Sequence, residues 1–182
     1  KQVTDYTDVS SSAWYYDAAK YVTDKKLMSG EKPYVFGADE ALTRAEVASA
    51  LYNLAGQPKV ELASFTDVPV THQARTAIAW AAKTGIMKGV GDNKFEPDRS
   101  VSREEIATLL SRQRKLSGVD VTADKNEVSA FVDSAKISSW AVDGVAYCTK
   151  SGLVKGNPGK VFAPAGNTTR AELATIIQRI AA

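Results

Sequence analysis

The chain has 182 residues, 44% of them apolar and 24% charged, and its 23 basic against 21 acidic side chains give a net charge of +2. The composition is typical of a globular protein, and the length predicts one domain or two small ones. The low net charge disfavours a nucleic-acid partner, and no apolar run reaches the ~20 residues that span a membrane. One Cys and one His exclude an internal disulfide and predict no metal site and no cofactor. The chain starts at Lys1 without an initiator Met or an apolar leader, which predicts a mature fragment of a longer protein.

Three stretches of the sequence share one pattern, at about 6–56, 65–118 and 131–181. Each opens with an aromatic residue, any residue and an Asp. A Gly follows 22 or 23 residues after the Asp, and a Phe and an Arg stand six and fourteen residues after the Gly. The three copies read Tyr6, Asp8, Gly30, Phe36, Arg44; Phe65, Asp67, Gly89, Phe95, Arg103; and Phe131, Asp133, Gly156, Phe162, Arg170. Spacings repeated three times predict three units, at 1–58, 59–120 and 121–182, folded together as one module.

Each unit predicts a helix, a loop and a second helix. Apolar side chains recur on one helical face at 14–22, 77–81 and 142–147 for the first helix, and at 47–55, 106–110 and 173–180 for the second. Glycines and prolines mark the loops, where short β-bridges are expected near 35–36, 94–95 and 161–162. The polar connectors 57–64 and 119–130 are expected to be linkers. Since a unit of about 55 residues buries too little surface to be stable alone, we expect an all-α fold with the helices in a shared core.

The second helix of every unit begins with the same four-residue pattern. A Thr or Ser stands at the cap and a Glu follows three residues later, which predicts a capping box that satisfies backbone donors. The pairs are Thr43 with Glu46, Ser102 with Glu105, and Thr169 with Glu172. The cap does not explain the neighbouring Arg, because a cation in the first turn faces the positive end of the helix dipole at a cost of about 0.3–1 kcal/mol.

The recurrence of Arg44, Arg103 and Arg170 at this position therefore indicates a bound anion. A guanidinium beside a helix N-terminus suits a carboxylate or a phosphate, because it combines a fork of donors with aligned backbone N–H groups. The alternative is an internal ion pair with the Asp that opens each unit. Both hold if the Asp orients the Arg toward a ligand.

These features resemble three tandem S-layer homology repeats, the module that anchors bacterial surface proteins to the cell wall. The resemblance covers nearly the whole chain. It rests on the opening aromatic-x-Asp triplets, Trp14, Trp140, the glycine loop with its Phe, and the Thr-Arg-Ala-Glu helix starts. It implies a pseudo-threefold arrangement, with a central helical bundle and grooves between neighbouring repeats. It also implies a non-catalytic, extracellular module whose grooves bind a secondary cell-wall polysaccharide capped by a pyruvylated amino sugar.

The resemblance makes four sets of repeated residues candidate ligand contacts. The arginines would bind the carboxylate of the pyruvyl ketal, and the opening aspartates would accept sugar hydroxyls or orient the arginines. The tryptophans would stack on a sugar ring, unless they belong to the core. The loop glycines would let the backbone approach the sugar, unless they serve only as a turn or helix C-cap. The sets are Arg44, Arg103, Arg170; Asp8, Asp67, Asp133; Trp14, Trp140; and Gly30, Gly89, Gly156.

The second repeat departs from the pattern at two places. Gln73, preceded by His72, stands where the first and third repeats have Trp, and Glu104 adds a negative charge beside Arg103. A neighbouring carboxylate competes with that of a ligand, so the groove that uses these residues is expected to bind more weakly. The sequence does not assign each Arg to a particular neighbour's Gly.

Two other functions stay open at this point. The repeats could bind peptidoglycan itself, or they could form a protein-interaction surface of stacked helices, although such a surface gives no reason for a repeated Arg. An enzyme is disfavoured, because the repeated acids are caps or follow an aromatic residue, and because His72 and Cys148 lie in different repeats. Cys148 is expected to be buried on a helix face. No membrane insertion is expected, and the oligomeric state is not predicted.

Overall fold

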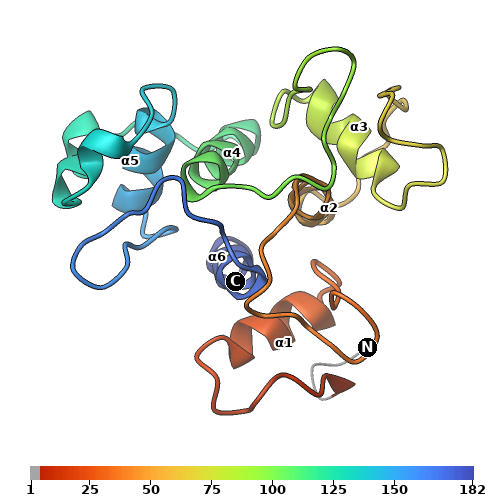
Figure 1. Cartoon of the computed structure of the whole chain (residues 1–182), viewed down its shortest axis with the longest axis horizontal. Helices are drawn as coiled ribbons and strands as arrows, with labels where there is room; N and C mark the ends of the chain where they lie inside the picture. Colours follow the sequence, from red (N-terminus) through yellow and green to blue (C-terminus); the bar gives the residue numbers. More distant parts are fainter. Residues whose placement is uncertain (1–4) are drawn as a thin grey trace. The chain divides into compact units, whose positions relative to one another are not determined.

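The computed structural model of the protein describes residues 5–182 (Figure 1). Its helices are α1 (Tyr16–Asp24), α2 (Arg44–Leu54), α3 (Arg75–Lys83), α4 (Arg103–Leu116), the 3₁₀ helices η2 (Lys125–Ala130) and η3 (Ser134–Lys136), α5 (Val142–Lys150) and α6 (Arg170–Ala181). Over residues 5–182 there are isolated β-bridges and no sheet, so the all-α prediction is confirmed. The pseudo-threefold arrangement stays a prediction.

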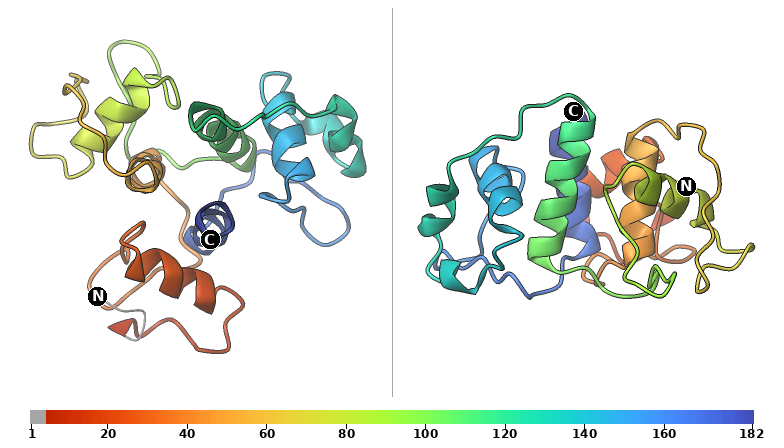
Figure 2. Two further views of the ribbon diagram at one scale, coloured as in Figure 1. Left: turned by 180° about the vertical axis from the view of Figure 1, so that it is seen from behind. Right: turned by 90° about the horizontal axis from the view of Figure 1, so that it is seen from above.

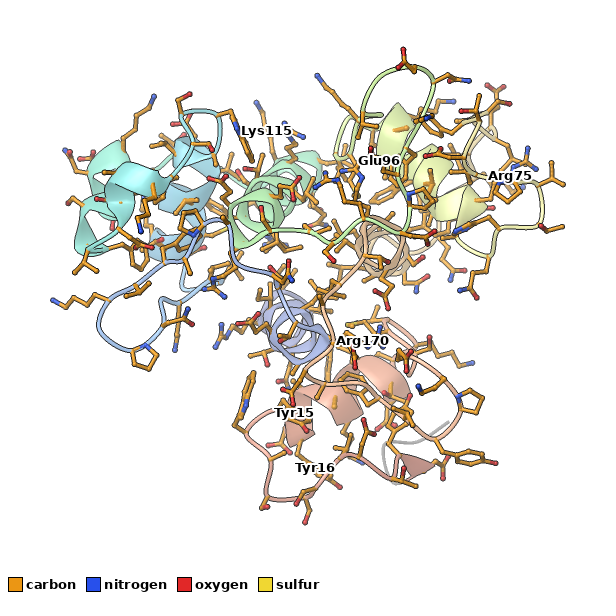
Figure 3. All side chains as sticks on the ribbon, viewed as in Figure 1. Tyr15, Tyr16, Arg75, Glu96, Lys115 and Arg170 are labelled. Atoms are coloured by element: carbon orange, nitrogen blue, oxygen red, sulfur yellow. The ribbon has the colours of Figure 1, made fainter. Side chains whose placement is uncertain are left out.

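Helices α2, α4 and α6 begin at the repeated Arg with the predicted capping box. In α2 the Thr43 hydroxyl accepts the N–H of Glu46 at 3.2 Å, and a Glu46 carboxylate oxygen accepts the N–H of Thr43 at 2.8 Å. The same box caps α4 and α6. Helices α1 and α5 have no side-chain cap. Helix α1 begins only at Tyr16, because residues 11–15 form turns and a bend (Figure 3). The apolar pattern that started this helix at Trp14 was therefore two residues too long.

The chain folds into two compact units that do not coincide with the repeats. Unit 1 contains Lys1–Lys83, Met87–Ser100 and Thr169–Ala182, and unit 2 contains Thr84–Ile86 and Val101–Thr168. In unit 1, α6 packs on α1 and α2 packs on α3, whereas in unit 2 α4 packs on α5 (Figure 2). The second helix of each repeat therefore pairs with the first helix of a different repeat: the first with the second, the second with the third, and the third with the first.

The largest buried side chains come from the faces that the apolar pattern selected and from the three loop phenylalanines. In unit 1 the fully buried residues include Val22, Phe36, Val47, Leu51, Ile78, Phe95, Leu173 and Ile177. In unit 2 they include Ile106, Leu110, Val145, Cys148 and Phe162. Each loop is thus anchored in the interior of its unit by its Phe.

The connections between helices match the prediction in part. Each loop has the expected short bridge, from Lys32 to Val35, Gly91 to Lys94 and Asn157 to Val161. Residues 57–64 form no helix, as expected for a linker. The prediction of a linker at 119–130 is wrong over η2. There the Asp124 carboxylate accepts the N–H of Asn126 at 2.8 Å and starts a 3₁₀ turn that packs on α5.

Candidate functional site

The repeated arginines are buried, and each reaches into the loop of another repeat. Arg170 is only 4% exposed; its Nε donates to the carbonyl of Phe36 at 2.8 Å and its Nη2 donates to the carbonyl of Ser29. Arg44 makes the same contacts with Phe95 (2.8 Å) and Lys88 (2.7 Å), and Arg103 with Phe162 (2.7 Å) and Lys155 (2.9 Å). Each guanidinium also lies over the ring of that Phe, at 4.5–5.4 Å from its centroid. Each Arg thus binds the loop that contains one of the repeated glycines: Arg170 the loop of Gly30, Arg44 that of Gly89, and Arg103 that of Gly156.

The opening aspartates accept hydrogen bonds from the N–H groups of the loops whose carbonyl groups the arginines bind. Asp8 accepts the N–H groups of Phe36 and Gly37, both at 2.8 Å, so the Phe36 peptide group is held by Asp8 and by Arg170. The corresponding bonds run to Asp67 from Phe95 (2.9 Å) and Glu96 (2.7 Å), and to Asp133 from Phe162 and Ala163 (both 2.8 Å). Burial alone would raise the pKa of Asp8, but the two N–H donors outweigh it and hold the pKa below its ordinary value.

The loop glycines complete the cluster because a side chain there would collide with it. A Cβ on Gly30 would lie 2.6 Å from Cε1 of Tyr6 and 2.6 Å from the carbonyl oxygen of Val35. On Gly89 it would lie 2.9 Å from the carbonyl oxygen of Lys94, and on Gly156 it would lie 2.7 Å from Cε1 of Phe131. The opening aromatic ring packs against this glycine and against the loop Phe, at ring distances of 5.2–5.6 Å. The repeated motif therefore builds and locks one loop per repeat.

We expect acidification to loosen the three loops together. The pKa values of Asp8, Asp67 and Asp133 are all lowered in the folded chain, whereas an unfolded Asp titrates near about 3.9. A carboxyl group with a lowered folded pKa contributes stability that is complete above the unfolded pKa and is lost as the pH falls through the folded pKa. Thermal melts followed by circular dichroism should therefore show a fall in Tm below about pH 4. An Asp8→Asn/Asp67→Asn/Asp133→Asn variant should start lower at pH 7 and decline less in acid, and an unchanged acid decline would contradict this assignment.

Unit 1 contains a groove of about 800 Å³ in which some of the predicted site residues meet. It is lined by the loop 27–31, by α2, by the segment 72–77 and by Arg170, which projects from the start of α6 (Figure 3). Gly30 and Arg170 are the predicted contacts that it brings together. Gln73 lines the same groove, at the position where the other repeats have Trp.

The charge of this groove is more negative than the sequence suggested. The Nη1 of Arg170 pairs with Glu46 Oε1 at 2.5 Å, while Glu46 Oε2 stays on the cap residue Thr43. Three more acids, Glu31, Glu40 and Asp98, line the groove, and Arg170 is the one Lys or Arg side chain among the lining residues that the structure describes. The anion that the repeated Arg predicted is therefore, in this groove, a carboxylate of the chain itself.

Both tryptophans that were predicted to contact a sugar, Trp14 and Trp140, are on the surface. Trp14 is 70% exposed in the turn before α1, with its ring edge-on to Tyr15 at 5.4 Å, and Trp140 is 56% exposed before α5. The alternative that these residues belong to the core is therefore wrong. Their stacking on a sugar stays a prediction.

Glu104 has a structural role in unit 2. One of its carboxylate oxygens accepts the N–H of Ser138 at 2.8 Å and the other accepts the hydroxyl of Ser138 at 2.9 Å. Glu104 is 9% exposed. Its charge is thus neutralised in part by donors from the third repeat, a contact that the sequence comparison did not reveal because the other repeats have Ala at this position.

Cys148 is buried, as predicted. Its Sγ lies 3.4 Å from the carbonyl oxygen of Ala107, and burial raises the pKa of the thiol to about 12. A thiol with this pKa is not an activated nucleophile.

The geometry defines a class of protein: helical repeats in which an Arg from each repeat closes the glycine loop of another. A family model for the S-layer homology domain matches residues 5–48, 64–107 and 130–174. These matches cover most of the sequence, and the chain belongs to the S-layer homology domain family. Domains of this family are non-catalytic modules that anchor S-layer and cell-surface proteins to the cell wall, which places the chain at the cell surface.

Relatives match over nearly the whole chain. They include an amylopullulanase of Thermoanaerobacterium thermosulfurigenes (32% identical over 94% of this chain and 9% of the relative) and exoglucanase XynX of Acetivibrio thermocellus (30%, 97% and 16%). An S-layer protein of Bacillus thuringiensis subsp. finitimus is 27% identical over 96% of this chain and 21% of the relative. The chain thus spans about a fifth or less of the length of these proteins. Between residues 5 and 182, no helix combines the length and apolar character needed to cross a bilayer.

Proposed function

We propose that the chain anchors a larger surface protein by binding a secondary cell-wall polysaccharide, and that the repeated arginines take the carboxylate of its terminal pyruvylated amino sugar. The observation that carries this proposal is the guanidinium of Arg170. Its Nε and Nη2 are held by loop carbonyls, while its Nη1 holds a carboxylate in the groove of unit 1. A guanidinium fixed in this way is pre-organised to take a ligand carboxylate on the same atom.

Binding at Arg170 is then an exchange of one carboxylate for another. Glu46 keeps its second oxygen on Thr43, so its Oε1 leaves Arg170 without opening the helix cap. Small side chains line the groove around it, including Gly30, Ala41 and Ser49. A volume of about 800 Å³ suits a sugar residue with its substituents.

The other repeated residues take supporting roles in this proposal. The exposed indoles of Trp14 and Trp140 offer apolar faces on which a sugar ring stacks. The aspartates and loop glycines position the loops, because the aspartate oxygens accept loop N–H groups and neighbouring atoms leave no room for a Cβ at the glycines. Arg44 and Arg103 are held by the same backbone contacts as Arg170, and we assign them the same role.

An uncharged glycan, such as the glycan strand of peptidoglycan, is the second candidate ligand. The acidic surplus of the groove favours it, because Glu31, Glu40 and Asp98 repel an anionic sugar and accept hydrogen bonds from neutral hydroxyls. The two candidates differ in one chemical group, the ketal carboxylate, and this difference decides between them.

Glu46→Gln is expected to strengthen binding of the ketal-bearing polysaccharide by about tenfold, or about 1.4 kcal/mol. The Gln side chain keeps the capping box but no longer neutralises Arg170. Isothermal titration of the 182-residue chain with wall polysaccharide before and after removal of the ketal, and with bare peptidoglycan, measures the effect.

The matched control is Glu40→Gln, which removes the same charge from the same groove but leaves the Arg170–Glu46 pair in place. We expect a smaller gain for this control. Equal affinity for polysaccharide with and without the ketal would rule out carboxylate recognition, and tighter binding of peptidoglycan than of the polysaccharide would establish the second candidate.

A further inference from the structure

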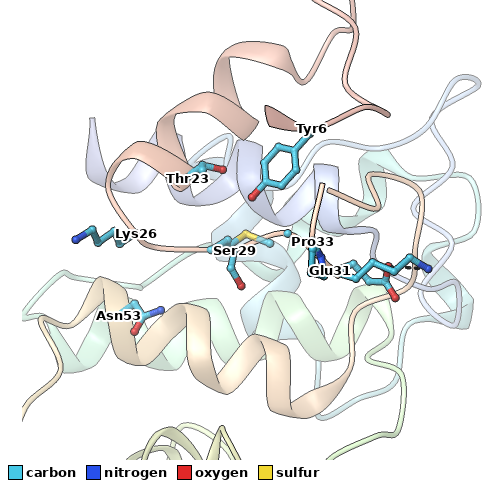
Figure 4. Close-up of a pocket in the computed structure, with 10 residues that line it drawn as sticks. Tyr6, Thr23, Lys26, Ser29, Glu31, Pro33 and Asn53 are labelled. Atoms are coloured by element: carbon cyan, nitrogen blue, oxygen red, sulfur yellow. Dashed lines mark ion pairs between the residues drawn. The ribbon is translucent and has the colours of Figure 1, made fainter. Parts of the chain in front are cut away.

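A second cavity in unit 1, which we name the Tyr6 pocket, adjoins the groove. It has a volume of about 460 Å³, and its lining includes Tyr6, Thr23, Lys26, Ser29 and Asn53 (Figure 4). Residues 28–31 and Asn53 line both the pocket and the groove. A chain-like ligand in the groove therefore has the pocket as its neighbour.

One hydroxyl group at the Tyr6 pocket has no hydrogen-bond partner among the described residues, and a second points into the pocket (Figure 4). Thr23 is 7% exposed, and its Oγ1 is buried without a hydrogen bond to any residue that the structure describes. Tyr6 is 6% exposed, and its hydroxyl points into the pocket (Figure 4). Buried polar groups are almost always hydrogen-bonded, so an unpaired hydroxyl at a cavity wall indicates a polar occupant.

The backbone conformation of Lys26 also indicates that the pocket has a function. Lys26 has a positive φ of 57°, at the position where the other repeats have Gly85 (φ 76°) and Gly152 (φ 70°). Glycine adopts this conformation freely, whereas a lysine is strained in it. The first repeat alone thus places a lysine at the edge of this pocket, against the local preference of the backbone.

Two further exchanges distinguish the pocket of the first repeat: one adds a hydroxyl group and the other leaves more space. Tyr6 stands where the other repeats have Phe65 and Phe131, so only this repeat has the hydroxyl. Asn53 stands where they have arginines, and it donates to the carbonyl of Leu27 at 3.2 Å. In the second repeat Arg112 donates to the corresponding carbonyl of Ile86 at 3.0 Å. The shorter Asn makes the same contact and leaves space that a longer Arg side chain would occupy.

We propose that the Tyr6 pocket is a second sugar subsite, which takes the pyranose unit next to the terminal unit held in the groove; this rests on the proposed function. Its hydroxyls and the Lys26 ammonium match the hydroxyl groups of an uncharged sugar, which both donate and accept hydrogen bonds. The neighbouring charges of Glu31 and Lys32 face each other at 3.4 Å. The pocket therefore selects for a polyhydroxylated ring and lets the module hold two consecutive sugars of the glycan.

The test compares two probes prepared from the wall polysaccharide, its terminal monosaccharide and its terminal disaccharide, by isothermal titration with the 182-residue chain. The disaccharide is expected to bind about tenfold more tightly. Tyr6→Phe and Lys26→Gly, which install the residues of the other repeats, should each remove most of this advantage and leave the affinity for the monosaccharide unchanged. Lys26→Gly should also raise Tm, because it relieves the strain at that residue.

The matched control is Lys160→Gly. Lys160 is an exposed lysine of the third repeat with a φ of 58°, so its replacement should raise Tm in the same way and leave both affinities unchanged. Failure of the parent chain to bind the monosaccharide would overturn the proposed function and the subsite with it. If the monosaccharide binds but the disaccharide binds no more tightly, only the subsite is overturned. The same holds if the disaccharide binds more tightly and keeps this advantage in Tyr6→Phe and Lys26→Gly.

Discussion

Arg170→Ala is expected to lower the free energy of unfolding by about 3–5 kcal/mol, the range seen when one partner of a buried charged network is removed. The side chain is 4% exposed, and its loss leaves the carbonyls of Phe36 and Ser29 without their donor and Glu46 without its counter-ion. A loss of this size corresponds to a fall in Tm on the order of 10 °C for a chain of this length. Thermal melts followed by circular dichroism measure it directly.

Lys115→Ala is the control, because Lys115 is an exposed cation in the last turn of α4. We expect it to change stability by less than about 0.5 kcal/mol. If Arg170→Ala melted like this control, the guanidinium would not hold the loop. The expected loss also means that an Arg→Ala variant cannot separate ligand binding from folding, which is why Glu46→Gln is the sharper binding test.

Gly30→Ala is expected to cost about 3 kcal/mol through overpacking alone. The new Cβ would lie 2.6 Å from the Tyr6 ring and 2.6 Å from the carbonyl oxygen of Val35. A backbone carbonyl cannot move without the loop that carries it, so the clash is not relieved by a side-chain rotation. Chemical denaturation at constant pH, with the m-value checked, measures the loss.

Gly159→Ala separates this steric effect from backbone conformation. Gly159 has a φ of 79° and no atom within 4 Å of its would-be Cβ, so its replacement is expected to cost only about 1 kcal/mol, from the left-handed backbone. If Gly30→Ala kept full stability and lost glycan binding, the glycine would serve the sugar and not the loop. The two hypotheses for this residue thus give opposite results in one melt.

The sequence predicted the features that depend on local pattern. The repeats, the capping boxes at Thr43, Ser102 and Thr169, and the all-α fold all follow from fixed spacings and helical periodicity. The prediction that the first helix includes Trp14 was wrong, because apolar periodicity does not distinguish an exposed indole in a turn from one on a helix.

The partners of the repeated residues were beyond the sequence for two reasons. Three copies of one pattern carry no information on which copy contacts which, so only the folded structure reveals that Arg170 binds the loop of Gly30. Backbone carbonyls also have no sequence signature, because every residue has one. An Arg that donates to carbonyls is indistinguishable, in one sequence, from an Arg that binds an anion.

The packing of α6 on α1 brings the two ends of the chain together. Asp24 and Arg170 are 146 positions apart (170 minus 24), whereas α4 and α5, the pair in unit 2, are separated only by residues 117–141. During synthesis from the N-terminus, we therefore expect unit 2 to be complete before α6 is available to pack on α1. Until the last helix emerges, the apolar face of α1 around Ala18 and Val22 has no permanent cover and is exposed to chaperones and to aggregation. In a surface protein that carries this module, the first repeat therefore has no packing partner for α1 until α6 of the third repeat is available outside the cell.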